Sequence, residues 1–221
     1  MERNWNMDEV SDGKRYCSND MVKLGCQECA GCSSCCRDMG SSIVLDPYDI
    51  YRMSSELGWS FEEMMAKCLE FNMVDGLILP NLRMVEGKNQ CTFLSDEGRC
   101  RIHTARPGIC RLFPLGRIYE NGSFQYFLQV HECKKTSRTK MKISKWLETP
   151  RLKQYEQFIS QWHYYLKTFQ QQIMECQDET YTRQTNMQVL NQFFVQPYDT
   201  GEDFYTQFAH RMKEIEEKAE H

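Results

Sequence analysis

The feature that most constrains this chain is a run of cysteines near its N-terminal end. Five of the twelve cysteines fall within eleven residues, at Cys26, Cys29, Cys32, Cys35 and Cys36. Two thiolates separated by two residues can reach one metal ion, and zinc takes four ligands. Three successive steps of this kind exceed what one tetrahedral site needs, and the adjacent Cys35 and Cys36 suit different metal ions better than one. The run therefore predicts either one cluster that uses part of it or two sites that share it with cysteines farther along the chain.

Structural disulfides are the competing interpretation of these cysteines. Twelve cysteines in 221 residues lie below the share of about 8–10% that marks a disulfide scaffold. Residues 1–10 are polar and acidic and lack the apolar core of a signal peptide. No apolar run approaches the roughly 18 residues of a membrane helix. We therefore expect a cytoplasmic protein without a membrane contact, whose reduced thiols bind metal.

One subset of the run resembles the cysteine spacing of bacterial ferredoxins. It reads Cys26-x2-Cys29-x2-Cys32-x3-Cys36. Arg37 stands where the ferredoxin run has proline, and the chain holds no second copy of the run. The spacing favours an iron–sulfur cluster, whereas the two departures weaken that assignment.

A second subset, Cys29-x2-Cys32-x2-Cys35-Cys36, pairs with a distal set of cysteines. The sequences CAGCSSCC at 29–36 and CTFLSDEGRCRIHTARPGICRLFP at 91–114, with a later cysteine, resemble the YkgJ-type cysteine-cluster family, which is described as a zinc- or iron-chelating domain. The resemblance covers about residues 26–135. It implies eight metal ligands: Cys29, Cys32, Cys35, Cys36, Cys91, Cys100, Cys110 and Cys133. Cys26 is additional to the pattern, and His103 stands where an aromatic residue is also common.

The ligand type leaves zinc and iron both open, because thiolates suit either metal. Eight cysteines match two four-cysteine zinc sites or two four-cysteine clusters. The ferredoxin-like spacing favours at least one iron–sulfur cluster over zinc alone.

Positive charge is concentrated in the middle of an acidic chain. The net charge is −4, but residues 99–145 carry 11 Lys and Arg against 2 Asp and Glu. Residues 99–117 hold five arginines and no acid, which suits hydrogen bonds to anionic metal-bound sulfurs. Residues 134–145 are harder to assign in this way, and they suggest a nucleic-acid or protein partner, or a solvated loop.

The hydrophobic pattern predicts an α+β fold with two parts. Residues 1–148 form a cysteine-rich metal-binding part with short strands and helices, and residues 149–221 form a helical extension packed on it. Asp46 and Pro47 predict a helix start, Gly58 its end, and Ser60 with Glu63 a capping box for a second helix. An apolar stripe that includes Tyr155, Ile159 and Trp162 predicts a long helix after Thr149-Pro150.

Short strands are expected at 41–45, 77–79, 82–85 and 91–94. Asn121-Gly122 predicts a hairpin turn between 117–119 and 124–128. We expect Cys68 in the core, on the apolar face of the second helix.

The sequence favours a metal-binding protein and leaves its biochemical role open. It contains no nucleophile elbow, phosphate-binding loop or zinc-protease motif. A related cysteine-cluster region occurs in flagellin lysine methylases, so the resemblance also allows a protein-modifying enzyme. A metal-dependent interaction module is the third alternative.

Overall fold

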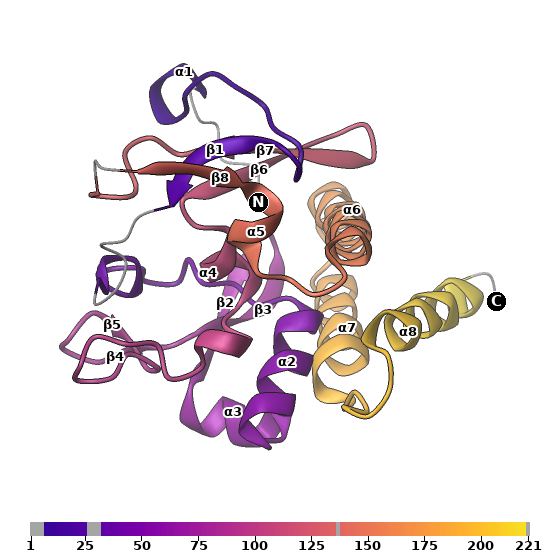
Figure 1. Ribbon diagram of the computed structural model, residues 1–221. Coiled ribbons are helices and arrows are strands. Elements are labelled where there is room, and N and C mark those ends of the chain that lie inside the picture. Colours follow the sequence, from indigo (N-terminus) through magenta and orange to yellow (C-terminus); the bar gives the residue numbers. More distant parts are fainter. Residues whose placement is uncertain (1–6, 26–31, 136–137, 220–221) are drawn as a thin grey trace.

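A computed structural model describes residues 7–25, 32–135 and 138–219 of the chain (Figure 1). It is a mixed α+β structure, which confirms the predicted fold class. The described strands form four separate two-stranded antiparallel sheets, and the long helices follow at the C-terminal end. No helix among the described residues is long and apolar enough to cross a bilayer.

Helices α2 (Pro47–Leu57) and α3 (Phe61–Lys67) begin where the sequence predicts, and α2 also ends there. Asp46 and Ser60 each form a complete capping box with the residue three positions later. Gly58 ends α2 with a φ of 66°, a left-handed conformation that glycine adopts without strain. Helix α3 ends two residues before the end of its predicted apolar face, which runs to Leu69, so Cys68 is its C-cap and not part of the helix.

The next segment contains more strand than the pattern indicated. Strands β2 (Leu69–Val74) and β3 (Leu77–Leu82) pair as a hairpin, followed by β4 (Met84–Val85) and β5 (Gln90–Cys91). Residues 41–45 do not form the expected strand, because only Val44 bridges to Asn81. Leu69 is the first residue of β2, and the residues after it alternate between half-buried and exposed positions, as in a strand with one face toward solvent.

Two further ribbons lie together in Figure 1. Strands β6 (Leu115–Glu120) and β7 (Ser123–Leu128) form the hairpin predicted at Asn121-Gly122. Strand β1 (Met21–Gly25) pairs with β8 (Thr139–Lys142), which is far away in the sequence. No strand was expected in either segment of this ribbon. The remaining short elements are α1 (Met7–Val10), η2 (Ser34–Cys36), η3 (His103–Ala105), α4 (Gly108–Leu112) and α5 (Ile143–Leu147).

The C-terminal helices are α6 (Leu152–Cys176), α7 (Glu179–Leu190), the π-helical η4 (Asn191–Val195) and α8 (Phe204–Ala219). The apolar stripe of α6 is the predicted one. The predicted start is wrong by two residues, because Arg151 and not Thr149 is the N-cap. The Thr149 hydroxyl instead donates a hydrogen bond to the Leu147 carbonyl.

Two apolar cores hold these elements. The larger one joins α2, α3 and β2–β3 to α6, η4 and α8, so Met53 and Met64 share a core with Trp162 and Phe208. The smaller one lies between the β1–β8 and β6–β7 ribbons and includes Ile143 of α5. Helix α6 therefore packs on the cysteine-rich part through a large shared core.

Candidate metal centre

The first cysteines of the site lie on η2, which the backbone fastens to the β4–β5 hairpin. The Asp38 amide donates to the Asn89 carbonyl at 2.7 Å, and Arg37 forms a β-bridge with Gln90. The Arg37 side chain also donates to the Gln90 side chain at 3.0 Å. These bonds bring Cys35 and Cys36 to the strand that carries Cys91.

The loop after β5 returns on itself and brings Cys100 back toward Cys91. Leu94 forms a β-bridge with Cys100, and the Arg101 amide donates to the Phe93 carbonyl at 2.9 Å. Residues 95–98, a predicted turn, lie at the tip of this loop. The sequence therefore explains this local fold, because the turn residues let the chain reverse between Cys91 and Cys100.

Cys110 reaches the site from the short helix α4. The Gly108 amide donates to the buried Asp49 carboxylate at 2.7 Å, which ties the start of α4 to helix α2. A side chain at Gly108 would collide with the hydroxyl of Tyr155 on α6. Glycine is required here by this close approach, and the packing fixes the helix that presents Cys110.

The grouped thiols act on each other electrostatically. The Cys36 thiol donates a hydrogen bond to Cys35, which lowers the pKa of Cys35 to about 6 and raises the pKa of Cys36. Burial first, and neighbouring thiolates in addition, raise the pKa of Cys91, Cys100 and Cys110. These five cysteines from four segments are thus close enough that ionising one hinders ionisation of the next.

The remaining predicted ligands are Cys32, Cys133 and Cys29. Cys32 is half-buried, donates to the Ser34 hydroxyl at 3.6 Å and interacts with Cys35. Cys133 is half-buried after β7, and its carbonyl accepts a hydrogen bond from Arg138. Cys29, like the additional Cys26, lies outside the described residues. Six of the eight predicted ligands therefore each interact electrostatically with at least one other: Cys32, Cys35, Cys36, Cys91, Cys100 and Cys110.

The arginines of residues 99–117 divide into two sets. Arg101 and Arg106 lie on the side of the cysteines, where their charges lower the pKa of Cys100 against the larger effect of burial. Arg111 instead turns into the core, with its side chain 2% exposed and its Nη2 4.0 Å from the Asp49 carboxylate. Arg117 donates to the Tyr155 hydroxyl at 3.2 Å. Only the first set matches the expectation that these arginines face the sulfurs.

The hydrogen bonds of Arg106 also account for the role of His103. The Arg106 guanidinium donates one hydrogen bond to His103 Nε2 at 3.0 Å and another to Glu148 at 3.3 Å. Burial and the Arg106 charge lower the pKa of His103. Since Nε2 accepts this bond, His103 serves as a partner of Arg106 in the structure.

Sequence analysis missed a buried carboxylate pair behind the cysteines. Asp46 and Asp49 are both buried and cap α2 reciprocally. Burial and the neighbouring Asp49 raise the pKa of Asp46 to about 8. The Asp-Pro-x-Asp spacing of the cap was visible in the sequence, but its burial against Arg111 was not.

The donor set suits a thiophilic metal. Cysteine sulfur is the ligand that zinc and iron–sulfur clusters share. The Arg106 Nε is buried and has no hydrogen-bond partner within the described residues, and it lies on the arginine that interacts with Cys35 and Cys100. Such a donor suits a metal-bound sulfur. Across residues 7–25, 32–135 and 138–219, however, no three His, Cys, Asp or Glu side chains are grouped as a metal-binding set.

Comparison with known families agrees with this donor set. The model of the CxxCxxCC family, described as "Putative zinc- or iron-chelating domain", matches residues 28–178. The chain belongs to the CxxCxxCC family. The matched range of this family runs from the cysteine run to just past the end of α6, so it includes the helix that packs behind Cys110. Comparisons with curated proteins and with solved structures find no match.

Proposed function

We propose that this CxxCxxCC protein holds its metal through Cys29, Cys32, Cys35, Cys36, Cys91, Cys100, Cys110 and Cys133, with at least one iron–sulfur cluster. The observation that supports the proposal is that cysteines from η2, β5, the returning loop and α4 influence one another's ionisation. Segments this far apart in sequence have no other evident reason to present thiols to each other.

The surroundings of the thiols support the same assignment. A cation relieves the mutual repulsion of ionised thiols, and Arg101 and Arg106 offset part of the negative charge that remains. Lys135 interacts with Cys32, so the segment that contains Cys133 approaches the same neighbourhood. A bound iron–sulfur cluster would supply one-electron redox chemistry, and zinc would supply a structural link.

The deciding experiment is anaerobic purification followed by metal and acid-labile sulfide analysis. An iron–sulfur protein is expected to be brown, to contain iron and sulfide in comparable amounts, and to bleach with dithionite. A colourless preparation with stoichiometric zinc and no sulfide would reject the cluster and keep the metal site. A preparation without either metal, after expression in medium supplied with both, would reject the metal site itself.

A specific observation favours a second function, nucleic-acid binding. On the exposed face of the β1–β8 ribbon, Lys23 lies directly opposite Lys140, and Met21 lies opposite Lys142. Like charges directly opposite each other destabilise a strand pair. None of the three lysines has an ion-pair or hydrogen-bond partner through its side chain in the described residues. A two-stranded ribbon fits the major groove of duplex DNA, whose phosphates would neutralise these charges.

Salt dependence tests the basic ribbon. We expect binding to a 20-base-pair duplex to weaken steeply with salt, with a slope of log K against log salt of about −0.9 for each phosphate contact. The triple variant Lys23→Gln, Lys140→Gln, Lys142→Gln should flatten this slope by up to about 3. The variant Lys88→Gln, at an exposed lysine on the turn between β4 and β5, should leave the slope unchanged. Equal slopes in all three proteins would reject the ribbon as a nucleic-acid surface.

A further inference from the structure

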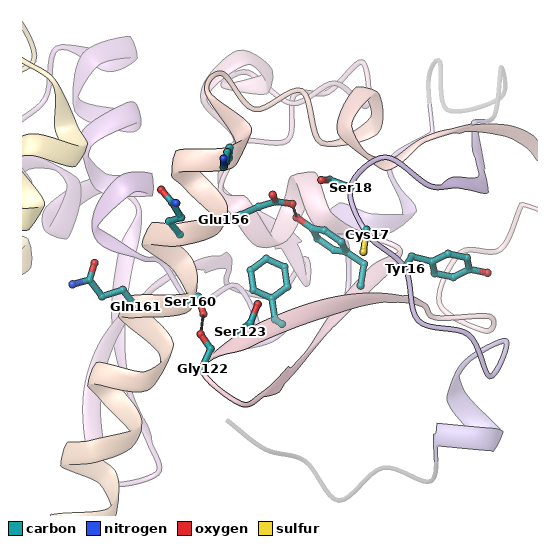
Figure 2. Close-up of a pocket in the computed structure, with 12 residues that line it drawn as sticks. Tyr16, Cys17, Ser18, Gly122, Ser123, Glu156, Ser160 and Gln161 are labelled. Atoms are coloured by element: carbon teal, nitrogen blue, oxygen red, sulfur yellow. Dashed lines mark hydrogen bonds between the residues drawn. The ribbon is translucent and has the colours of Figure 1, made fainter.

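A pocket of about 440 Å³ lies apart from the cysteines, between α6, the β6–β7 hairpin and residues 16–18 (Figure 2). Its volume is within the range of small-molecule sites, roughly 300–1,000 Å³. The first half of α6 forms one wall, and Gly122 to Phe124 with Tyr126 form the other. Tyr16, Cys17 and Ser18 close one side.

Two hydrogen bonds hold the walls together. The Tyr126 hydroxyl donates to the Glu156 carboxylate at 3.0 Å, and the Ser160 hydroxyl donates to the Gly122 carbonyl at 2.9 Å. Both bonds run from the hairpin to α6 and are visible as dashed lines in Figure 2. Two of the walls of the pocket are therefore fixed to each other, and residues 16–18 complete it.

The hairpin wall presents an open strand edge to this pocket. The amide and carbonyl of Tyr126 both bond to Tyr16, on the side away from β6. In an antiparallel strand every second residue points its backbone groups to the same side. The amide and carbonyl of Phe124 therefore point to the same side of β7 as those of Tyr126. Residues 16–18 no longer run alongside β7 at this position. Neither group has a hydrogen-bond partner on that side within the described part of the chain.

The helical wall presents two opposite charges that do not pair with each other. Lys153 is exposed, and its ammonium group has no hydrogen bond or ion pair within the described residues. Glu156 is half-buried and accepts from Tyr126 through Oε1 only. Side chains three residues apart on a helix have Cβ atoms about 5–6 Å apart. Both side chains extend several bonds beyond Cβ, so their charged ends can span the roughly 7 Å between the two ends of an extended dipeptide.

We propose that this pocket binds a short zwitterionic peptide of dipeptide size. Its amino group binds Glu156, its carboxylate binds Lys153, and its peptide group bonds to the open edge at Phe124. The ring of Phe124 offers an apolar surface for one peptide side chain. This site is independent of the metal centre and requires no metal.

Calorimetric titration of the full chain with alanyl-phenylalanine tests the proposal. We expect the free dipeptide to bind, and the N-acetylated and C-amidated forms each to bind at least about tenfold more weakly, because one charge is lost in each. Lys153→Met should remove the difference between the dipeptide and its amide. Glu156→Gln keeps an acceptor for Tyr126 and should remove the difference between the dipeptide and its acetylated form.

The controls separate this pocket from general charge effects. Lys88→Met removes an exposed lysine outside the pocket and should leave all affinities unchanged. Absence of binding to the wild-type chain at millimolar dipeptide would overturn the proposal. Binding that Lys153→Met and Glu156→Gln leave unchanged would overturn it as well.

Discussion

At the scale of single residues, the cysteines differ more in surroundings than in chemistry. Cys110 is next to the buried Arg111 and interacts with Cys35, Cys91 and Cys100. Cys68 is fully buried at the end of α3, and burial is the main cause that raises its pKa to about 11. Cys68 interacts with one site thiol, Cys91, and burial dominates its surroundings, whereas Cys110 interacts with three other thiols.

This contrast gives a prediction for metal content. Cys110→Ala should lower the metal bound per folded protein, because it removes a proposed ligand. Cys68→Ala should keep the metal and lower the free energy of unfolding by about 1 kcal/mol, the cost of a small cavity. Elemental analysis of the monomeric fraction and urea denaturation measure the two effects. Equal metal loss in both variants would show that Cys68 is a ligand.

At the scale of elements, the cap of α2 couples helix stability to a buried carboxyl group. The Asp46 carboxylate accepts from the Asp49 amide at 2.8 Å, and its pKa is raised to about 8 by burial and by Asp49. The folded chain therefore keeps a proton that an unfolded Asp, with a pKa of about 3.9, has lost. This group lowers the free energy of unfolding progressively as pH rises from about 4 to about 8.

Asp46→Asn should remove this pH dependence and keep the cap, since asparagine caps helices as well as aspartate. The variant should gain stability relative to the wild type between pH 5 and pH 8, as measured by urea denaturation with reduced thiols. For Asp96→Asn, in the exposed turn before Cys100, the free energy of unfolding should change with pH in parallel with the wild type. A parallel profile for Asp46→Asn would contradict the role of this carboxyl group.

The elements that the sequence predicted are those with local signals. Capping residues and Gly58 defined α2 and α3, and Asn121-Gly122 defined the β6–β7 turn. The β1–β8 ribbon was missed because its strands are joined only by distant pairing, which leaves no short-range pattern. The start of α6 was misplaced because Arg151 caps it without a side-chain hydrogen bond.

The site, like the fold, was predictable only where the signal is local in the sequence. Cysteine spacing indicated which thiols could act together, and which of them bind a metal stays a prediction. The separate roles of Arg106 and Arg111 depend on which way each side chain turns, and the packing of α4 against α2 and α6 decides that. The metal itself stays a prediction, because thiolates suit zinc and iron alike.

At the scale of the whole molecule, the larger core makes the cysteine-rich part and the C-terminal helices interdependent. Trp162 of α6 is 4% exposed and packs against the rings of Phe193, Phe194 and Phe208. The same core contains Met64 of α3 and Leu77 of β3. Loss of packing in α6 should therefore destabilise β2–β3 as well.

Trp162→Ala should lower the free energy of unfolding by about 3–5 kcal/mol. Hydrogen exchange should show the same loss of protection in β2–β3 and in α6, because one core serves both. Met187→Ala, at an exposed methionine of α7, should change stability by no more than about 0.5 kcal/mol. Loss of protection confined to α6 and α8 would mean that the helical part unfolds on its own.

The pairing of β1 with β8 also sets an order of events during translation. Gly25 has no strand partner until Thr139 is synthesised, 114 residues later. At about 5–20 residues per second, the nascent β1 strand remains without its partner for roughly 6–23 seconds. Cys32, Cys91 and Cys110 all emerge within that interval. The thiols can therefore meet, and take up a metal, before the ribbon beside them closes.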